Sequence, residues 1–69
     1  MRLSARNVLP GRVVKIITGA VTSHVCIDVG GSVVTAAITN EAVKELGLSE
    51  GASASAVIKA SDVMVGVDD

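Results

Sequence analysis

Two short segments far apart in the sequence each place a cation within two residues of a hydroxyl group. They are Ser4-Ala5-Arg6-Asn7 and Lys59-Ala60-Ser61. A small oxyanion needs positive charge together with several hydrogen-bond donors, and arginine and lysine side chains supply both. If the fold brings the segments together, they form one anion site.

The two segments contain no carboxylate, which decides what kind of anion suits them. A carboxylate acceptor would favour an anion that still carries a proton, such as monohydrogen phosphate. Donors alone favour a fully deprotonated tetrahedral dianion. Asp62 adjoins the second segment and has to point away from such a site. Each segment alone is also typical of a solvated strand end, so only the combination favours a site.

The composition predicts a thin hydrophobic core. Hydrophobic residues make up 49% of the 69 residues, yet Phe, Tyr and Trp are absent, and aromatic side chains normally bury the largest areas. Below about 70–80 residues one core rarely supplies more than roughly 3–5 kcal/mol. The single Cys26 cannot form an internal disulfide, and no Cys/His cluster has zinc spacing. We therefore expect one domain, residues 1–69, that is stabilised by self-association.

Several function classes are disfavoured. A net charge of -1 and the lack of aromatic residues argue against a nucleic-acid partner. No apolar run approaches the roughly 20 residues that span a bilayer, and no signal peptide opens the chain. The lone thiol fits a reducing compartment, so we expect a cytoplasmic protein. One His and one Cys assemble no nucleophile–base pair, which argues against an enzyme.

Period-two patterns predict most of the secondary structure. Leu3 to Val8 is expected to be extended, with Pro10-Gly11 as a break. Further strands are expected over residues 13–17, 21–29 and 32–38, with Gly30-Gly31 as a hairpin turn. In the second of these, Val21, Val25, Ile27 and Val29 are expected to share the buried face with Ser23.

The pattern changes after Ile38. Thr39-Asn40-Glu41 predicts the start of a helix of about two turns, and Gly47 its end. Residues 52–59 and 63–67 alternate again and predict two last strands, separated by a break at Ser61-Asp62. The economical fold is all-β with one short helix that plugs a small OB-like barrel, because closure removes exposed sheet edges.

The other titratable residues are expected to have ordinary structural roles. His24 and Cys26 lie on the same polar strand face, and two such residues do not make a metal site. A role of His24 near an anion site stays open. Arg12 and Lys15 are expected to be surface charges, with steering of anions as the alternative. Glu41 and Glu45 are expected on the solvated face of the helix.

The chain resembles the molbindins, small molybdate- and tungstate-binding proteins that consist of one Mop domain. The resemblance covers residues 1 to about 67. It rests on the Ser-Ala-Arg-Asn opening, the run Val-Lys-Ile-Ile-Thr-Gly-Ala-Val-Thr at 14–22, the Gly-Gly hairpin, Val-Lys-Glu-Leu-Gly-Leu at 43–48, and the closing Val-Ile-Lys-Ala-Ser-Asp-Val-Met at 57–64.

The resemblance implies a five-stranded OB-like (Mop-type) barrel whose N-terminal strand is exchanged with a neighbour. It also implies a homohexamer, built as a trimer of dimers, that binds molybdate or tungstate between subunits and needs no organic cofactor or metal cation. One subunit would provide Ser4, Ala5, Arg6 and Asn7, and another would provide Lys59, Ala60 and Ser61, with Thr39 close by. A second, axial site would lie at Gly19, Ala20, Val21 and Thr22.

The function expected from this resemblance is intracellular storage or buffering of the oxyanion, without catalysis. The alternative is an oligomeric regulatory module whose response to the ligand acts on a partner protein.

Overall fold

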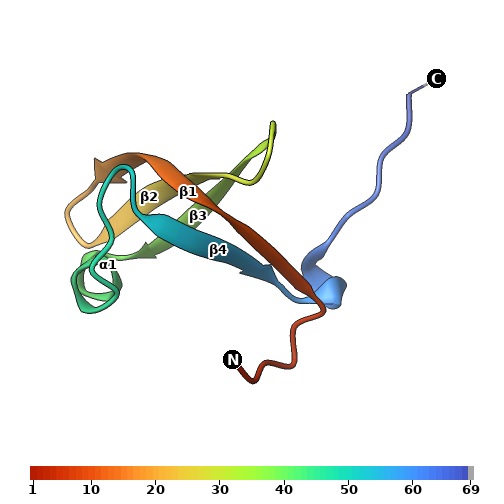
Figure 1. The fold of residues 1–69 in the computed structure, drawn as a ribbon, viewed down its shortest axis with the longest axis horizontal. Helices are drawn as coiled ribbons and strands as arrows, with labels where there is room; N and C mark the ends of the chain where they lie inside the picture. The colour runs from red at the N-terminus through yellow and green to blue at the C-terminus, as the bar shows by residue number, and fades with distance from the viewer. Residues whose placement is uncertain (69) are drawn as a thin grey trace.

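The computed structural model describes residues 1–68, which form one curled antiparallel sheet with a short helix at its end (Figure 1). The sheet order is β3-β2-β1-β4. The elements are β1 (Asn7–Thr18), β2 (Thr22–Asp28), β3 (Val33–Thr39), α1 (Asn40–Glu45), β4 (Ser53–Ile58) and the 3-10 turn η1 (Ala60–Asp62). The expected all-β class with one short helix is confirmed.

Strand β1 pairs with two different strands along its length. Residues 7–12 lie against β4, and residues 12–18 lie against β2, with a bulge between Val13 and Lys15. The expected break at Pro10-Gly11 is wrong, because both residues lie inside this twelve-residue strand. Pro10 is paired only on its β4 side, so its missing N–H is tolerated there.

Gly11 is required by a close approach between two strands. A Cβ atom at this position would lie 2.2 Å from the backbone oxygen of Asp28. Only glycine lets β1 pass β2 at this distance. The Pro-Gly pair therefore belongs to the strand crossing and does not mark a turn.

The hairpin turn predicted at Gly30-Gly31 is confirmed between β2 and β3. Gly30 and Gly31 have φ of 103° and 104°, and the backbone N–H of Val29 donates to Ser32 O at 2.9 Å. Such positive φ values favour glycine. The alternation along β2 is confirmed at Ser23, Val25 and Ile27, which are buried, and at His24, which is exposed. The prediction that Val21 is buried is wrong, because this residue lies in the turn before β2 and is 70% exposed.

The helix begins and ends where the sequence predicts. The Thr39 hydroxyl accepts a hydrogen bond from Ala42 N at 3.0 Å and caps α1. Leu46 is the C-cap residue of α1, and Gly47 follows it with φ 63°, the left-handed conformation that ends many helices.

The buried core is very small. Its fully buried hydrophobic members are Val13, Val25, Ile27 and Ala56. The accessible surface is 5325 Å², whereas a folded monomer of this mass exposes about 4,000 Å². The radius of gyration is 12.9 Å, against about 11 Å for a compact domain of this length. The thin core predicted from the composition is therefore confirmed.

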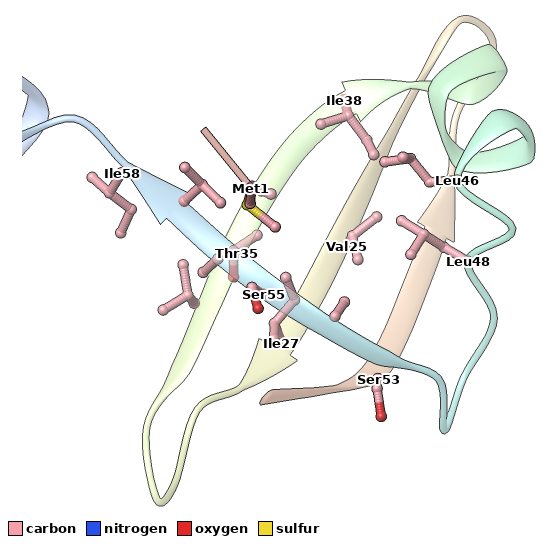
Figure 2. Close-up of a pocket in the computed structure, with 15 residues that line it drawn as sticks. Met1, Val25, Ile27, Thr35, Ile38, Leu46, Leu48, Ser53, Ser55 and Ile58 are labelled. Carbon is pink, nitrogen blue, oxygen red and sulfur yellow. The ribbon is translucent and has the colours of Figure 1, made fainter. Parts of the chain in front are cut away.

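The sheet curls without closing into a barrel within the described residues. β3 and β4 are its two edges, and an apolar groove of about 840 Å³ lies between them (Figure 2). The chain thus contributes four strands to its own sheet. The five-stranded count and the exchange of the N-terminal strand stay predictions, since β1 pairs with β2 and β4 of its own chain and residues 1–6 lie outside any strand.

The strand expected at residues 63–67 is not formed in the single chain. After η1 the chain runs away from the sheet in an extended path (Figure 1). A strand needs a neighbouring ladder, and the turn at η1 directs this segment away from both sheet edges.

We expect Gly11→Ala to lower the free energy of unfolding by about 1–3 kcal/mol, because the new methyl group overlaps Asp28 O and the strands must separate. Urea denaturation at fixed protein concentration measures this loss. Gly66→Ala is the matched control, since a Cβ there meets nothing within 4 Å. Equal stabilities of the two variants would contradict the close approach.

The β2–β3 turn also predicts a pH effect. Gly30 N and then Gly31 N donate to Asp28 Oδ1, at 2.9 and 3.1 Å, and hold the pKa of this carboxyl below its ordinary 3.8. A lowered pKa stabilises the fold above pH 3.8, and this contribution is lost as the pH falls through the folded-state pKa. Carbon-detected NMR titration measures that pKa, and Asp28→Asn should remove the contribution. A pKa at or above 3.8 would contradict the turn geometry.

Candidate functional site

The first candidate segment leads directly into β1. Asn7 is the first residue of this strand and lies opposite Ile58, the last residue of β4. The Asn7 side chain donates from Nδ2 to Ile58 O at 3.2 Å. Ser4 and Arg6 are exposed, and Ala5 is partly buried. The asparagine amide thus fixes the backbone at the point where the Arg6 side chain leaves it.

The second candidate segment follows directly after β4. Lys59 precedes η1 in an extended conformation, and its backbone oxygen accepts from Asp62 N at 2.9 Å. Lys59, Ala60 and Ser61 are exposed. Because these residues are exposed, a ligand has access to this segment.

The structure brings the two segments to the same end of the sheet within one chain. Because Asn7 pairs with Ile58, Arg6 and Lys59 are the next residues on either side of one antiparallel pair. Figure 1 shows the N-terminal segment and η1 at this shared end. Two cations and the Ser4 and Ser61 hydroxyls therefore belong to segments that adjoin the same end of the sheet, and these are the groups that an oxyanion requires.

Exposed apolar side chains adjoin this cationic end. Val8 and Val57 are paired in the next register position, and both are exposed, as is Leu9. Apolar strand residues beside a charged edge are typical of a surface that another protein chain covers.

Thr39 lies elsewhere in the chain. It is opposite Thr22 at the end of β3, where its hydroxyl caps α1. The length of β1 separates this position from Asn7 (Figure 1). The structure therefore does not unite Thr39 with Arg6 and Lys59 of the same chain, and only a second copy can bring it there.

Thr39 instead neighbours the predicted axial site. Residues 19–22 form the turn between β1 and β2, closed by a hydrogen bond from Gly19 N to Thr22 O at 2.8 Å. All four residues are exposed. A Cβ at Gly19 would lie 2.7 Å from Thr22 O, so this tight turn also excludes a side chain there.

Asn40 organises this turn, and the sequence reasoning missed its role. Its Nδ2 donates to Gly19 O at 2.9 Å, and its backbone N donates to Val21 O at 2.8 Å. Ser23 Oγ donates to Asn40 Oδ1 at 2.5 Å. Ser23 was the sequence signal that could have revealed this role. It is a hydroxyl residue among apolar ones on the inner face of β2, and a buried hydroxyl needs a hydrogen-bond partner.

These contacts bear on anion binding at the turn. The carbonyl oxygens of Gly19, Val21 and Thr22 are all engaged as acceptors by internal donors. Engaged carbonyl groups repel an approaching anion less than free ones do. The turn is compatible with an anion that binds to its backbone N–H groups.

Arg12 has a structural role that its sequence position did not reveal. Its Nη1 donates to Gly51 O at 2.7 Å, while Gly51 N donates to Val13 O at 2.8 Å. The guanidinium thus ties the loop before β4 to the bulge in β1. Arg12 is less available for an anion than Arg6.

The other titratable residues form no second site. His24 and the Glu41 and Glu45 side chains are exposed, as expected. Cys26 is a free thiol whose Sγ lies 3.8 Å from Thr35 Oγ1. Among residues 1–68, no three His, Cys, Asp or Glu side chains are grouped so that they could hold a metal ion.

The apolar groove between β3 and β4 reaches Ile58, the residue before Lys59, but no lysine or arginine lines it. The groove between β3 and β4 is lined mainly by aliphatic side chains, and neither Arg6 nor Lys59 contributes to it (Figure 2). An apolar groove without cations does not suit a dianion. No helix in the described part of the chain is both long and apolar enough to cross a membrane.

The chain is similar to a known domain family and to several known proteins. The model of the TOBE domain matches residues 3–65. A probable molybdenum-pterin-binding protein of Haemophilus influenzae is 51% identical over 99% of this chain and 100% of its own length.

Two solved structures are similar in fold. A molybdate-binding protein from Sporomusa ovata has a TM-score of 0.91 and 34% identity, over 97% of this chain and 100% of the other. The cytoplasmic molybdate-binding protein ModG, with molybdate bound, has a TM-score of 0.92 and 56% identity. The match covers 99% of this chain and 49% of the ModG chain.

The buried pair of Ser23 and Asn40 leads to a prediction. Asn40→Ala leaves the Ser23 hydroxyl without its acceptor, which should lower the free energy of unfolding by about 1–3 kcal/mol. Alanine favours helices more than asparagine does, so helix propensity cannot cause the loss. The double variant Ser23→Ala/Asn40→Ala should lose less than the sum of the single variants. Additive losses would show that the two side chains do not act together.

Proposed function

The chain belongs to the TOBE-domain family and to its Mop-type, or molbindin, members, and we propose that it binds molybdate or tungstate as a storage or buffering protein. The observation that carries this proposal is the position of Arg6 and Lys59 beside the same strand pair, Asn7 and Ile58. Two cations with hydroxyl and backbone donors match a tetrahedral dianion in charge and in hydrogen bonding.

The proposed interface site lies between subunits. Within one chain these two segments lie at the same end of the sheet. In the proposed assembly two such ends meet, so that Ser4, Ala5, Arg6 and Asn7 of one copy face Lys59, Ala60 and Ser61 of another. The exposed Val8 and Val57 next to these residues support an interface here. A second copy is also the only source of a nearby Thr39, because Thr39 of the same chain lies at the far end of β1.

The proposed assembly is a homohexamer that consists of three dimers. Its support is the accessible surface of one chain, which is in total about 1,300 Å² larger than that of a folded monomer of this mass and includes the exposed apolar side chains of Val8, Leu9 and Val57. The axial site at Gly19, Ala20, Val21 and Thr22 is the second proposed anion site. The exposed turn and its engaged carbonyl groups support it.

The proposed role involves binding without catalysis or an organic cofactor. The support for a binding role is the donor set of the cationic end, because two cations with hydroxyl groups beside them suit the holding of an anion. A cytoplasmic location is part of the proposal. It is supported by the similarity to ModG, a cytoplasmic protein, and by the free thiol of Cys26.

Arg6→Ala should weaken molybdate binding at the interface site at least about tenfold, which corresponds to about 1.4 kcal/mol. The assembly should stay intact, because Arg6 is exposed and outside the strands. Equilibrium dialysis measures the binding, and size-exclusion chromatography with light scattering measures the assembly. Arg2→Ala, which removes another exposed arginine outside the segment, is the matched control. Undiminished molybdate uptake by Arg6→Ala would refute the assigned site.

A further inference from the structure

Asn40, the first residue of α1, is bonded to both sides of the turn at residues 19–22. Its Nδ2 donates to Gly19 O at 2.9 Å, and its backbone N donates to Val21 O at 2.8 Å. Its Oδ1 accepts from Ser23 Oγ at 2.5 Å. The side-chain partners lie 17 and 21 positions away in the sequence, and Figure 1 shows α1 beside the turn between β1 and β2.

The two partners of the Asn40 side chain require a donor and an acceptor at once. Gly19 O is a carbonyl oxygen that can only accept, so the amide nitrogen must face it. Ser23 is 1% exposed, and its buried hydroxyl needs a partner, which the amide oxygen supplies. An uncharged amide carries both groups, whereas a carboxylate carries acceptors only. The residue type at position 40 is therefore matched to this turn.

These bonds determine which polar groups the turn offers to a ligand. The carbonyl oxygens of Gly19, Val21 and Thr22 all accept internal hydrogen bonds. Within residues 1–68, the backbone N–H groups of Ala20 and Val21 donate to no acceptor, and both residues are exposed. The turn thus presents two successive unused donors beside carbonyl groups that are mostly engaged.

Successive backbone N–H groups can bind an anion without a cation. No lysine or arginine occurs in residues 18–23, so the orientation of the N–H groups has to supply what charge supplies at the cationic end. Without its bond to Asn40, the Gly19 carbonyl would be free beside these donors. Its partial negative charge would then repel the anion.

We propose that Asn40 is the positioning residue of the anion site at residues 19–22 and that Ser23 acts on this site through Asn40. Asn40 does not touch the anion. It holds Gly19 O and fixes the turn, so that the N–H groups of Ala20 and Val21 are directed to one tetrahedral dianion. The proposal rests on the oxyanion binding of the proposed function and adds the residue that orients the donors of this site.

Two variants remove the bond to Gly19 O in different ways. Asn40→Asp keeps an acceptor for the Ser23 hydroxyl and places a carboxylate in the first turn of α1, where it is favourable, so the fold should be retained. Ser23→Ala/Asn40→Ala removes the donor without adding a charge or leaving a buried hydroxyl unpaired. Glu45→Ala changes an exposed residue at the other end of α1 and is the matched control.

Titration with molybdate, followed by proton–nitrogen correlation NMR, observes the two anion sites separately in one protein. The amide signals of Ala20 and Val21 report on the turn, and those of Arg6 and Lys59 report on the cationic end. In both variants, the turn signals should need at least about tenfold more molybdate to shift, while the signals of the cationic end respond as in the natural chain. General destabilisation would affect both sets of signals alike, and Glu45→Ala should alter neither.

Turn binding of natural strength in either variant would overturn the proposal and leave oxyanion binding at the cationic end in place. In the natural chain, a response of the Arg6 and Lys59 signals without one at Ala20 and Val21 would also overturn it, because the turn would then hold no anion. If none of these signals responds to molybdate, the proposed oxyanion binding fails together with the role of Asn40.

Discussion

The pairing of β1 with two strands is the interaction on which the rest of the structure depends. Its first half lies against β4 and its second half against β2. The change of partner occurs at Arg12, next to the close approach of Gly11 and Asp28 O. This arrangement curls the sheet, leaves β3 and β4 as separate edges, and brings residues 6 and 59 to one end of the molecule.

The same arrangement separates the two candidate anion sites. The cationic segments lie where β1 begins, and the turn of residues 19–22 lies where β1 ends. Asn40 and Ser23 fix that turn through a buried hydrogen bond, and α1 begins beside it. One strand thus positions a charged candidate site at one end and a backbone candidate site at the other. The thin core leaves apolar surface exposed near both, which is the physical reason that self-association is proposed.

Much of the fold was predictable because local chemistry determines it. The Gly30-Gly31 turn, the Thr39 cap and the Gly47 end of the helix follow from residue types at single positions. The path of β1 through Pro10-Gly11 was not predictable, because a distant strand decides whether the pair is a turn or a crossing. The isolation of residues 63–67 has a similar cause. Alternation shows that a segment can form a strand, but not which chain supplies its partner.

The candidate site likewise has features that were predictable from the sequence and features that were not. The residue types of Arg6 and Lys59 indicated an anion, and the register of Asn7 with Ile58 explains why they lie together. The position of Thr39 depends on the β2–β3 register and was not accessible from its neighbours in the sequence. Asn40 was overlooked because its contacts reach residues 17 and 21 positions away.

The central claim is that one anion site combines Arg6 and Lys59 from different copies of the chain. The most direct test mixes two defective variants, Arg6→Ala and Lys59→Ala, by unfolding and refolding them together, and counts the bound molybdate by equilibrium dialysis. If the site spans two copies, mixed assemblies contain sites with both natural residues and recover molybdate binding that neither variant shows alone. If mixing recovers no binding, each site takes both residues from one chain, and the claim is wrong.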